Sequence, residues 1–184
     1  NTGTGGKNHN KPLFLKIFVP QSLRATNSKI QFIEYSMTTV IIAEKPSVAN
    51  ELAKYLGHAQ RADGYISVGN YRVTWCFGHL LTLAEPHVYD EKYKKWRADD
   101  LPILPPDIKV IAKDDAGIRK QLKIIGGLLK EADDVIHAGD PDREGQLLVD
   151  WVLQHHKNRK PVKRLWLAAQ DSVSIQKALR NLQS

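Results

Sequence analysis

Short apolar runs alternate along the chain with segments whose apolar residues recur at helical spacing. Residues 40–43 form a continuous Val-Ile-Ile-Ala run, which is typical of a strand buried on both faces of a parallel sheet. Pro46 suits the first turn of a helix, and apolar residues then recur at helical spacing up to Gly57, a common residue at a helix end. The pattern therefore predicts a strand, a polar turn and a helix.

The next segment reads as a β-hairpin. Residues 65–68 and 71–77 have the composition of strands, and Gly69-Asn70 between them favours a tight turn. Residues 78–106 contain several prolines and many charges without a steady period, so we expect surface loops and short helical turns there.

Strand and helix patterns continue to alternate in the second half. The predicted strands are residues 108–112, 135–138 and 162–167, and the predicted helices are residues 118–129, 147–155 and 172–182, the last capped by Ser172. Such alternation predicts an α/β fold: an open, mostly parallel sheet of Rossmann-like type, with helices on both faces and the β-hairpin as an insertion. In these sheets ligands bind at the carboxyl ends of the strands.

The amino-acid composition excludes several classes of protein. Hydrophobic residues make up 42% and charged residues 26% of the 184 residues, which indicates a globular domain. No apolar run approaches the roughly 18 to 20 residues of a membrane-spanning helix, so we expect no membrane partner. The single cysteine, Cys76, excludes an internal disulfide and a Cys-rich zinc site, and it fits a reducing cytoplasm.

The net charge of +7 is unevenly distributed. Residues 1–36 hold five basic residues and one acidic residue, which is +4 of that charge, so residues 37–184 carry only +3. The first six residues read as a linker, and the only methionine, Met37, looks like a natural start. We therefore expect residues 1–36 to be a leader, a linker or an upstream extension outside the fold, and residues 37–184 to be the folded domain.

A cluster of carboxylates stands between a predicted strand and a predicted helix. Asp140, Asp142 and Glu144 lie at alternate positions, and Glu44 follows the first strand. Three like charges repel unless a cation lies among them, and oxygen ligands suit Mg²⁺, Mn²⁺ or Ca²⁺ rather than zinc. The alternative is that Asp140 and Glu144 only cap the following helix and favour its dipole, with Asp142 solvated.

Two metal-binding or phosphotransfer motifs fit the cluster poorly. An EF-hand loop that starts at Asp140 needs a bidentate Glu at its twelfth position, which is Trp151. A haloacid-dehalogenase-type motif resembles Asp-x-Asp-x-Thr or Asp-x-Asp-x-Val, but Glu144 occupies the fifth place here.

Three motifs in order resemble one family. The segments Ile-Ala-Glu-Lys-Pro-Ser at 42–47, Gly-His-Leu at 78–80 and Asp-Pro-Asp-Arg-Glu-Gly-Gln at 140–146 look like the Toprim domain of type IA DNA topoisomerases, most closely of the bacterial topoisomerase III group. The resemblance covers residues 37–184. It implies strand cleavage by a tyrosine hydroxyl that attacks a phosphodiester of single-stranded DNA, with Mg²⁺ as the cofactor.

The resemblance also implies roles for the acidic and basic residues. It makes Glu44 the acid–base group near the leaving 3′-oxygen and Lys45 the cation at the scissile phosphate. Asp140 and Asp142 would hold Mg²⁺, with Glu144 assisting directly or through water and Glu44 as a further ligand. Independently of the family, phosphoryl transfer needs charge stabilisation and a proton donor for the leaving oxygen, which a cation, a lysine and a carboxyl group can supply.

The nucleophilic tyrosine is the main departure. In the family it lies in a later domain, and none of the six tyrosines of this chain matches its motif. We therefore expect the chain to be the N-terminal fragment of a larger topoisomerase, completed by the remaining domains. The rival hypotheses are a stand-alone Toprim-type nuclease or primase-like protein, whose metal site needs no tyrosine, and a metal-dependent DNA-binding module without turnover.

Candidate DNA contacts are less well defined. His79 belongs to the Gly-His-Leu motif and Arg143 to the acidic motif, while Lys94, Lys95 and Arg97 alternate with aromatic residues, as in proteins that bind single strands. A solvated loop is the alternative for the last three. A second basic run over residues 157–164 has the same two interpretations.

Overall fold

The computed structural model describes residues 37–184. The interpretation of residues 1–36 as a leader or extension lies outside the described residues and stays a prediction. Across residues 37–184, no helix is both long enough and apolar enough to span a membrane.

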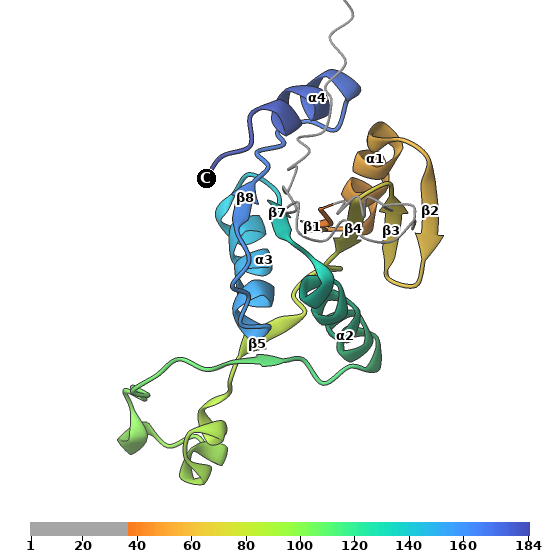
Figure 1. Cartoon of the computed structure of the whole chain (residues 1–184). Helices are drawn as coiled ribbons and strands as arrows, with labels where there is room; N and C mark the ends of the chain where they lie inside the picture. Colours follow the sequence, from red (N-terminus) through yellow and green to blue (C-terminus); the bar gives the residue numbers. More distant parts are fainter. Residues whose placement is uncertain (1–36) are drawn as a thin grey trace, which may run out of the picture. The chain divides into compact units, whose positions relative to one another are not determined.

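A six-stranded sheet forms the centre of the domain (Figure 1). Its strands, in spatial order, are β2 (Ala59–Ala62), β3 (Tyr65–Val68), β4 (Tyr71–Trp75), β1 (Thr39–Ala43), β7 (Asp134–Ala138) and β8 (Val162–Arg164). β1 is parallel to both β4 and β7, and β7 is parallel to β8, whereas β2, β3 and β4 pair antiparallel. The predicted mostly parallel α/β sheet is confirmed.

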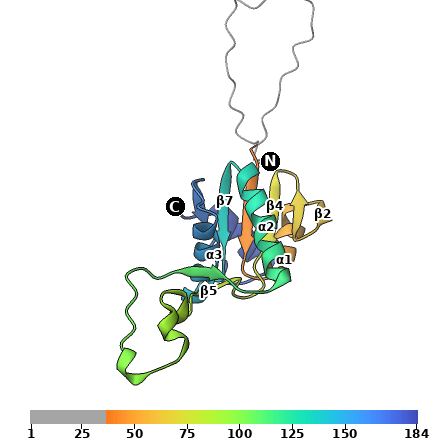
Figure 2. The ribbon, with the colours of Figure 1, turned by 90° about the horizontal axis from the view of Figure 1, so that it is seen from below.

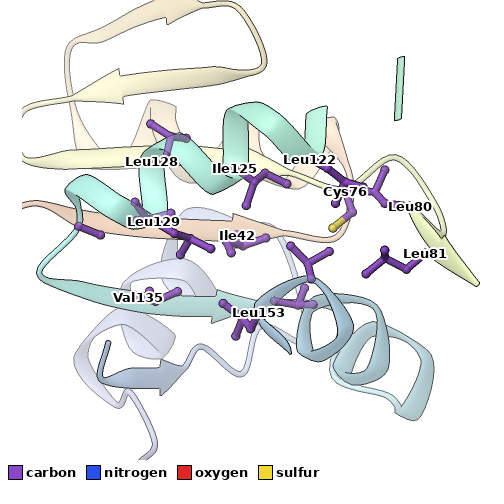
Figure 3. Packing of buried hydrophobic residues seen from close by; sticks show 14 residues of the cluster. Ile42, Cys76, Leu80, Leu81, Leu122, Ile125, Leu128, Leu129, Val135 and Leu153 are labelled. Atoms are coloured by element: carbon purple, nitrogen blue, oxygen red, sulfur yellow. The ribbon is translucent and has the colours of Figure 1, made fainter. Parts of the chain in front are cut away.

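Helices cover both faces of the sheet (Figures 1 and 2). The helices are α1 (Pro46–Leu56), α2 (Ala116–Glu131), α3 (Arg143–His155) and α4 (Ser172–Arg180). Alternate residues of β1 point to opposite faces, so Val40 and Ile42 pack with α2 and α3, whereas Ile41 and Ala43 pack with α1 and α4. The buried residues on the Val40 and Ile42 side of the sheet form the first core cluster. Figure 3 shows this cluster, in which Ile42 lies among leucines and isoleucines of α2 and α3. A strand that is buried on both faces explains the continuous apolar run.

The predicted hairpin exists but is part of the main sheet. β3 and β4 are joined through Gly69, whose φ of 53° suits a tight turn, and β4 then pairs in parallel with β1. β2 was not predicted, because all four of its residues are exposed and it carries no apolar pattern.

A strand forms within the predicted residues 108–112, but the prediction that it belongs to the main sheet is wrong. β6 (Val110–Ala112) pairs antiparallel with β5 (Leu81–Leu83) in a separate two-stranded sheet. The segment between them, residues 84–109, is called the extension here; it projects away from the main sheet in Figures 1 and 2 and contains three short 3₁₀ helices. Loops and short helical turns were expected there, but the antiparallel pairing depends on contacts that no local pattern reveals.

The N-terminal cap of the last helix also differs from the prediction. The Asp171 carboxylate accepts hydrogen bonds from the amides of Val173 and Ser174, each at 3.0 Å, so Asp171 and not Ser172 caps α4. The Ser174 side chain, followed by these two amide bonds, lowers the pKa of Asp171. Two adjacent residues of capping type made the boundary ambiguous by one position.

Candidate functional site

The carboxyl ends of β1 and β7 place two of the predicted acidic residues side by side. Ala43 and Ala138 are register partners, so Glu44 and the Gly139-Asp140 turn leave neighbouring strands at the same edge of the sheet. The amide of Asp140 donates a hydrogen bond to Oε2 of Glu44 over 3.1 Å. Residues that are 96 positions apart in the sequence therefore share one site, as the rule for parallel sheets predicts.

Lys45 belongs to the same group. Its ammonium Nζ lies 2.7 Å from Oδ2 of Asp140. The pKa of Lys45 is raised, first by this hydrogen bond and further by the negative charges of Asp140, Glu44 and Asp142. Lys45 therefore stays protonated and serves as the cation of the acidic group.

Asp142 and Glu144 have separate contacts. Oδ1 of Asp142 accepts a hydrogen bond of 2.7 Å from the amide of Gly145, so Asp142 is the N-terminal cap of α3. Asp142 therefore caps this helix in place of Asp140 or Glu144, while Glu144 lies in the first turn, where its charge favours the helix dipole. Glu144 instead lies 3.1 Å from Nε2 of His79. This contact joins the Gly-His-Leu motif to the acidic motif.

Close backbone packing holds the acidic turn against the start of α3. A Cβ atom on Gly145 would lie 2.5 Å from both the amide nitrogen and the carbonyl oxygen of Asp140, and 2.6 Å from Oε2 of Glu44. A Cβ on Gly139 would in turn meet the Gly145 carbonyl group. Only glycine fits at these two positions, so Gly145 is more than an ordinary turn glycine.

Arg164 fixes the same turn from the end of β8. Its guanidinium donates hydrogen bonds to four main-chain carbonyls and one side chain. The acceptors are the carbonyls of His137 (3.2 Å), Gly139 (2.8 Å), Asp140 (2.9 Å) and Leu165 (2.6 Å), and Oε1 of Gln146 (2.8 Å). As part of the basic run at residues 157–164, Arg164 was expected to be either a solvated loop residue or a DNA contact. Its place inside the predicted strand 162–167 was the available signal that it differs from the basic residues of the preceding loop.

His137 contacts both the Gly139-Asp140 turn and the first turn of α3. It is 1% exposed, its Nδ1 accepts from the amide of Gly139 over 3.3 Å, and its Nε2 lies 3.1 Å from the carbonyl of Gln146. An accepting Nδ1 requires the proton to be on Nε2, which is the neutral form. Burial lowers the pKa of His137, consistent with that form.

Cys76 has no accessible chemistry. The side chain is fully buried in the first core cluster (Figure 3). Burial, with a further contribution from the charge of Glu44, raises the pKa of its thiol to about 12. A buried protonated thiol is a poor nucleophile.

The donor set suits a hard divalent cation. In the hydrogen bonds described above, Glu44, Asp140 and Asp142 each use one carboxylate oxygen, which leaves the second oxygen of each free for a ligand. Within residues 37–184, no three His, Cys, Asp or Glu side chains converge closely enough to enclose a metal by themselves. Mg²⁺ fits this arrangement, because it commonly takes one or two carboxylates and keeps several waters.

The predicted DNA contacts divide into two groups. His79 contacts the acidic motif through Glu144, and Arg143 is exposed at the first position of α3. Lys94 and Arg97, by contrast, lie on the extension and pair locally with Glu91 (3.7 Å) and Asp99 (3.6 Å). Lys95 is on the extension too, and no ion pair or hydrogen bond among the described residues connects these three cations to the acidic site.

The fold and the site together define an α/β domain with an acidic centre at the carboxyl edge of a parallel sheet, built from a Glu after β1 and an Asp-x-Asp after β7. The family model described as "Toprim domain" matches residues 39–169. The chain belongs to the Toprim domain family, as its motifs predicted. Divalent-metal binding is a property of this family.

Individual relatives narrow the resemblance to one group of enzymes. The chain is 41% identical over 146 residues to DNA topoisomerase 3 of Bacillus cereus, 38% over 148 residues to that of Bacillus licheniformis and 37% over 148 residues to that of Bacillus subtilis. These matches cover 78 to 79% of this chain but 20% of each relative. The predicted similarity to bacterial topoisomerase III is confirmed, and the chain spans about a fifth of the length of these relatives.

Proposed function

We propose that this chain provides the acidic, Mg²⁺-binding part of the active site of a type IA DNA topoisomerase of the topoisomerase III group. Its substrate is single-stranded DNA or a single-stranded region of a duplex, and the tyrosine nucleophile comes from another part of the longer protein. The observation that carries the proposal is the group of Glu44, Lys45 and Asp140, which brings a carboxyl group, a cation and metal-type ligands to one strand edge. We also propose a cytoplasmic, DNA-associated location.

The free carboxylate oxygens of Asp140 and Asp142 would hold Mg²⁺, with Glu44 and Glu144 assisting directly or through water. When bound, the ion would stabilise negative charge on the phosphate oxygens.

The remaining roles belong to the side chains themselves. The Glu44 carboxyl group would move the proton at the leaving 3′-oxygen, since it lies beside Lys45 and the acidic turn. The ammonium of Lys45 can release Asp140 and bind the phosphate as a point charge. His79 would orient Glu144 through the 3.1 Å contact.

The first test is a chimera. Residues 37–184 replace the matching segment of Bacillus subtilis DNA topoisomerase 3, and plasmid relaxation and decatenation are measured with Mg²⁺. We expect activity that Asp140→Asn abolishes, with Asp99→Asn on the exposed extension as the control. A well-folded chimera without activity would contradict the proposal.

The rival nuclease hypothesis needs a different measurement. The chain is incubated with end-labelled single-stranded DNA, with and without Mg²⁺, beside its Asp140→Asn variant. We expect the DNA to remain intact. Mg²⁺-dependent cleavage that disappears in Asp140→Asn would instead establish a self-sufficient Toprim nuclease.

The double variant Asp140→Asn with Asp142→Asn should lose Mg²⁺ binding in a calorimetric titration. Its stability should change by only about 1 kcal/mol, because asparagine also caps helices and the Lys45–Asp140 pair is partly exposed. The matched control is Asp99→Asn with Asp100→Asn. Unchanged Mg²⁺ affinity in the first variant would remove the site assignment.

Lys45→Met should raise the affinity of the chain for Mg²⁺. The ammonium lies on Oδ2 of the Asp140 carboxylate whose free oxygen would hold the ion, so its positive charge repels the ion. We expect an increase of about two- to fivefold, the equivalent of one exposed ion pair. Lys54→Met is the control, because Lys54 pairs with Glu51 on the surface of α1. Equal affinities for the wild type and Lys45→Met would show that Lys45 and the metal do not share Asp140.

A further inference from the structure

A basic cavity lies at the edge of the sheet opposite the acidic site. It has a volume of about 240 Å³, and Gly126, Lys130, His156, Lys157, Arg159 and Lys160 are among its lining residues. α2 and α3 end here and lead into β7 and β8, so the cavity lies at the amino ends of these strands. The carboxylates of the acidic site lie at the other end of β7.

The four cations of this cavity have no counter-charge. Among residues 37–184, no ion pair or hydrogen bond involves the side chains of Lys130, Lys157, Arg159 or Lys160; the two bonds between the Asn158 side chain and Lys160 use only the backbone of Lys160. No acidic residue lines the cavity. These four charges exceed the net +3 of residues 37–184 and are concentrated at a single concave site. An anion bound here would balance them.

Helix capping does not account for this cluster. Cations near helix ends often favour the dipole by about 0.3 to 1 kcal/mol each. Here main-chain amides already satisfy the end of α3: Lys157 donates to the Gln154 carbonyl and Asn158 donates to the Leu153 carbonyl, both over 2.9 Å. At α2, the amide of Ala132 donates to the Leu128 carbonyl over 3.0 Å. The basic side chains are therefore not needed as caps.

His156 adds a polar atom without a partner. Its Nε2 is out of contact with solvent and forms no hydrogen bond with the described residues. The ring occupies space that Gly126 leaves open, because a Cβ on Gly126 would lie 2.8 Å from Cε1 and 2.9 Å from Nδ1 of the imidazole. A glycine inside a helix costs about 1 kcal/mol relative to alanine. α2 thus has a residue of low helix propensity at the position where the imidazole lines the cavity.

The backbone of Lys157 is also unusual. Its φ of 50° lies in the left-handed region, where glycine is the favoured residue after a helix. A lysine at this position is less stable than glycine would be, yet it places a fourth cation at the cavity.

We propose that this cavity binds a phosphate group, either the phosphodiester of a nucleic acid strand or the phosphate of a small compound. The site would be independent of the acidic centre. The cations would supply the charge, and the neutral tautomer of His156 that carries its proton on Nε2 would supply a hydrogen bond from that atom.

The test is a calorimetric titration of the full chain with inorganic phosphate at constant ionic strength. The pocket variant is Lys157→Gly with Arg159→Gln, and the control is Lys123→Gln with Lys177→Gln, which removes the same charge from exposed positions of α2 and α4. We expect phosphate affinity to fall about tenfold or more in the pocket variant and to change less than twofold in the control. Thermal stability should stay equal or rise in the pocket variant, because glycine suits the backbone at residue 157.

Two results would overturn the proposal: no phosphate binding by the wild-type chain, or the same loss in the control as in the pocket variant. A second titration with a single-stranded oligonucleotide identifies the source of the phosphate. A parallel loss would indicate a nucleic acid strand, and a loss for inorganic phosphate alone would indicate a small compound. Asp140→Asn should leave phosphate binding intact, so failure at the acidic site and failure at this cavity remain distinguishable.

Discussion

Gly145→Ala is expected to unfold the acidic turn and to destabilise the domain by about 3 kcal/mol or more. The new methyl group would lie 2.5 Å from two main-chain atoms of Asp140 and 2.6 Å from the Glu44 carboxylate. Main-chain atoms cannot rotate away, so the start of α3 has to separate from the β7 turn. The melting temperature should fall by roughly 6 to 12 °C, as measured by thermal denaturation.

Gly127→Ala provides the matched control. Gly127 also lies inside a helix, but no atom lies within 4 Å of the position that its Cβ would take. Apart from its own helix, the site is open, so this substitution should raise the free energy of unfolding by up to about 1 kcal/mol, because alanine is the better helix former. If both variants changed stability in the same direction and by similar amounts, the close packing at Gly145 would be refuted.

Arg164→Ala should have the second large effect. It removes every hydrogen bond of the guanidinium and leaves the carbonyls of Gly139 and Asp140 without this donor. Hydrogen bonds to charged groups contribute about 1.5 to 3 kcal/mol each, and partly exposed carbonyls can recover some of this from water. We therefore expect a loss of about 3 kcal/mol in urea denaturation, together with weaker Mg²⁺ binding because Asp140 is no longer held in place.

Two further variants separate charge from geometry. Arg164→Lys keeps the positive charge near the acidic turn but cannot reproduce the planar set of donors, so it should recover only part of the lost stability. Arg61→Ala removes an exposed guanidinium whose one hydrogen bond within residues 37–184 is to the Asn50 side chain, and it should change stability by less than about 1 kcal/mol. A full recovery in Arg164→Lys would mean that charge alone accounts for the effect.

Local patterns predicted the fold class and the proximity of Glu44 and Asp140. The run at residues 40–43 identified the central strand, since burial on both faces requires continuous apolar residues. Glu44 and Asp140 could be placed together because residues that follow parallel strands meet at one edge of the sheet. Their proposed roles came from the family resemblance, and the variants above test them.

The missed features depend on contacts between distant residues. Arg164 looked like its basic neighbours, and only the folded chain shows its guanidinium bonded to the turn that begins 25 residues earlier. The pairing of β5 with β6 is non-local, and β2 has no buried residue to reveal it. The unpartnered Nε2 of His156 likewise follows from packing against Gly126.

The pairing of β5 with β6 makes the extension tolerant of deletion or exchange. Leu83 and Val110 are register partners, so the intervening residues leave and re-enter the domain at adjacent points. Because loop-closure entropy grows only slowly with length, this segment could be shortened or exchanged for a foreign peptide at little cost to the main sheet. Trp96, which is 76% exposed on the extension, is also a site where a fluorescent reporter would leave the core undisturbed.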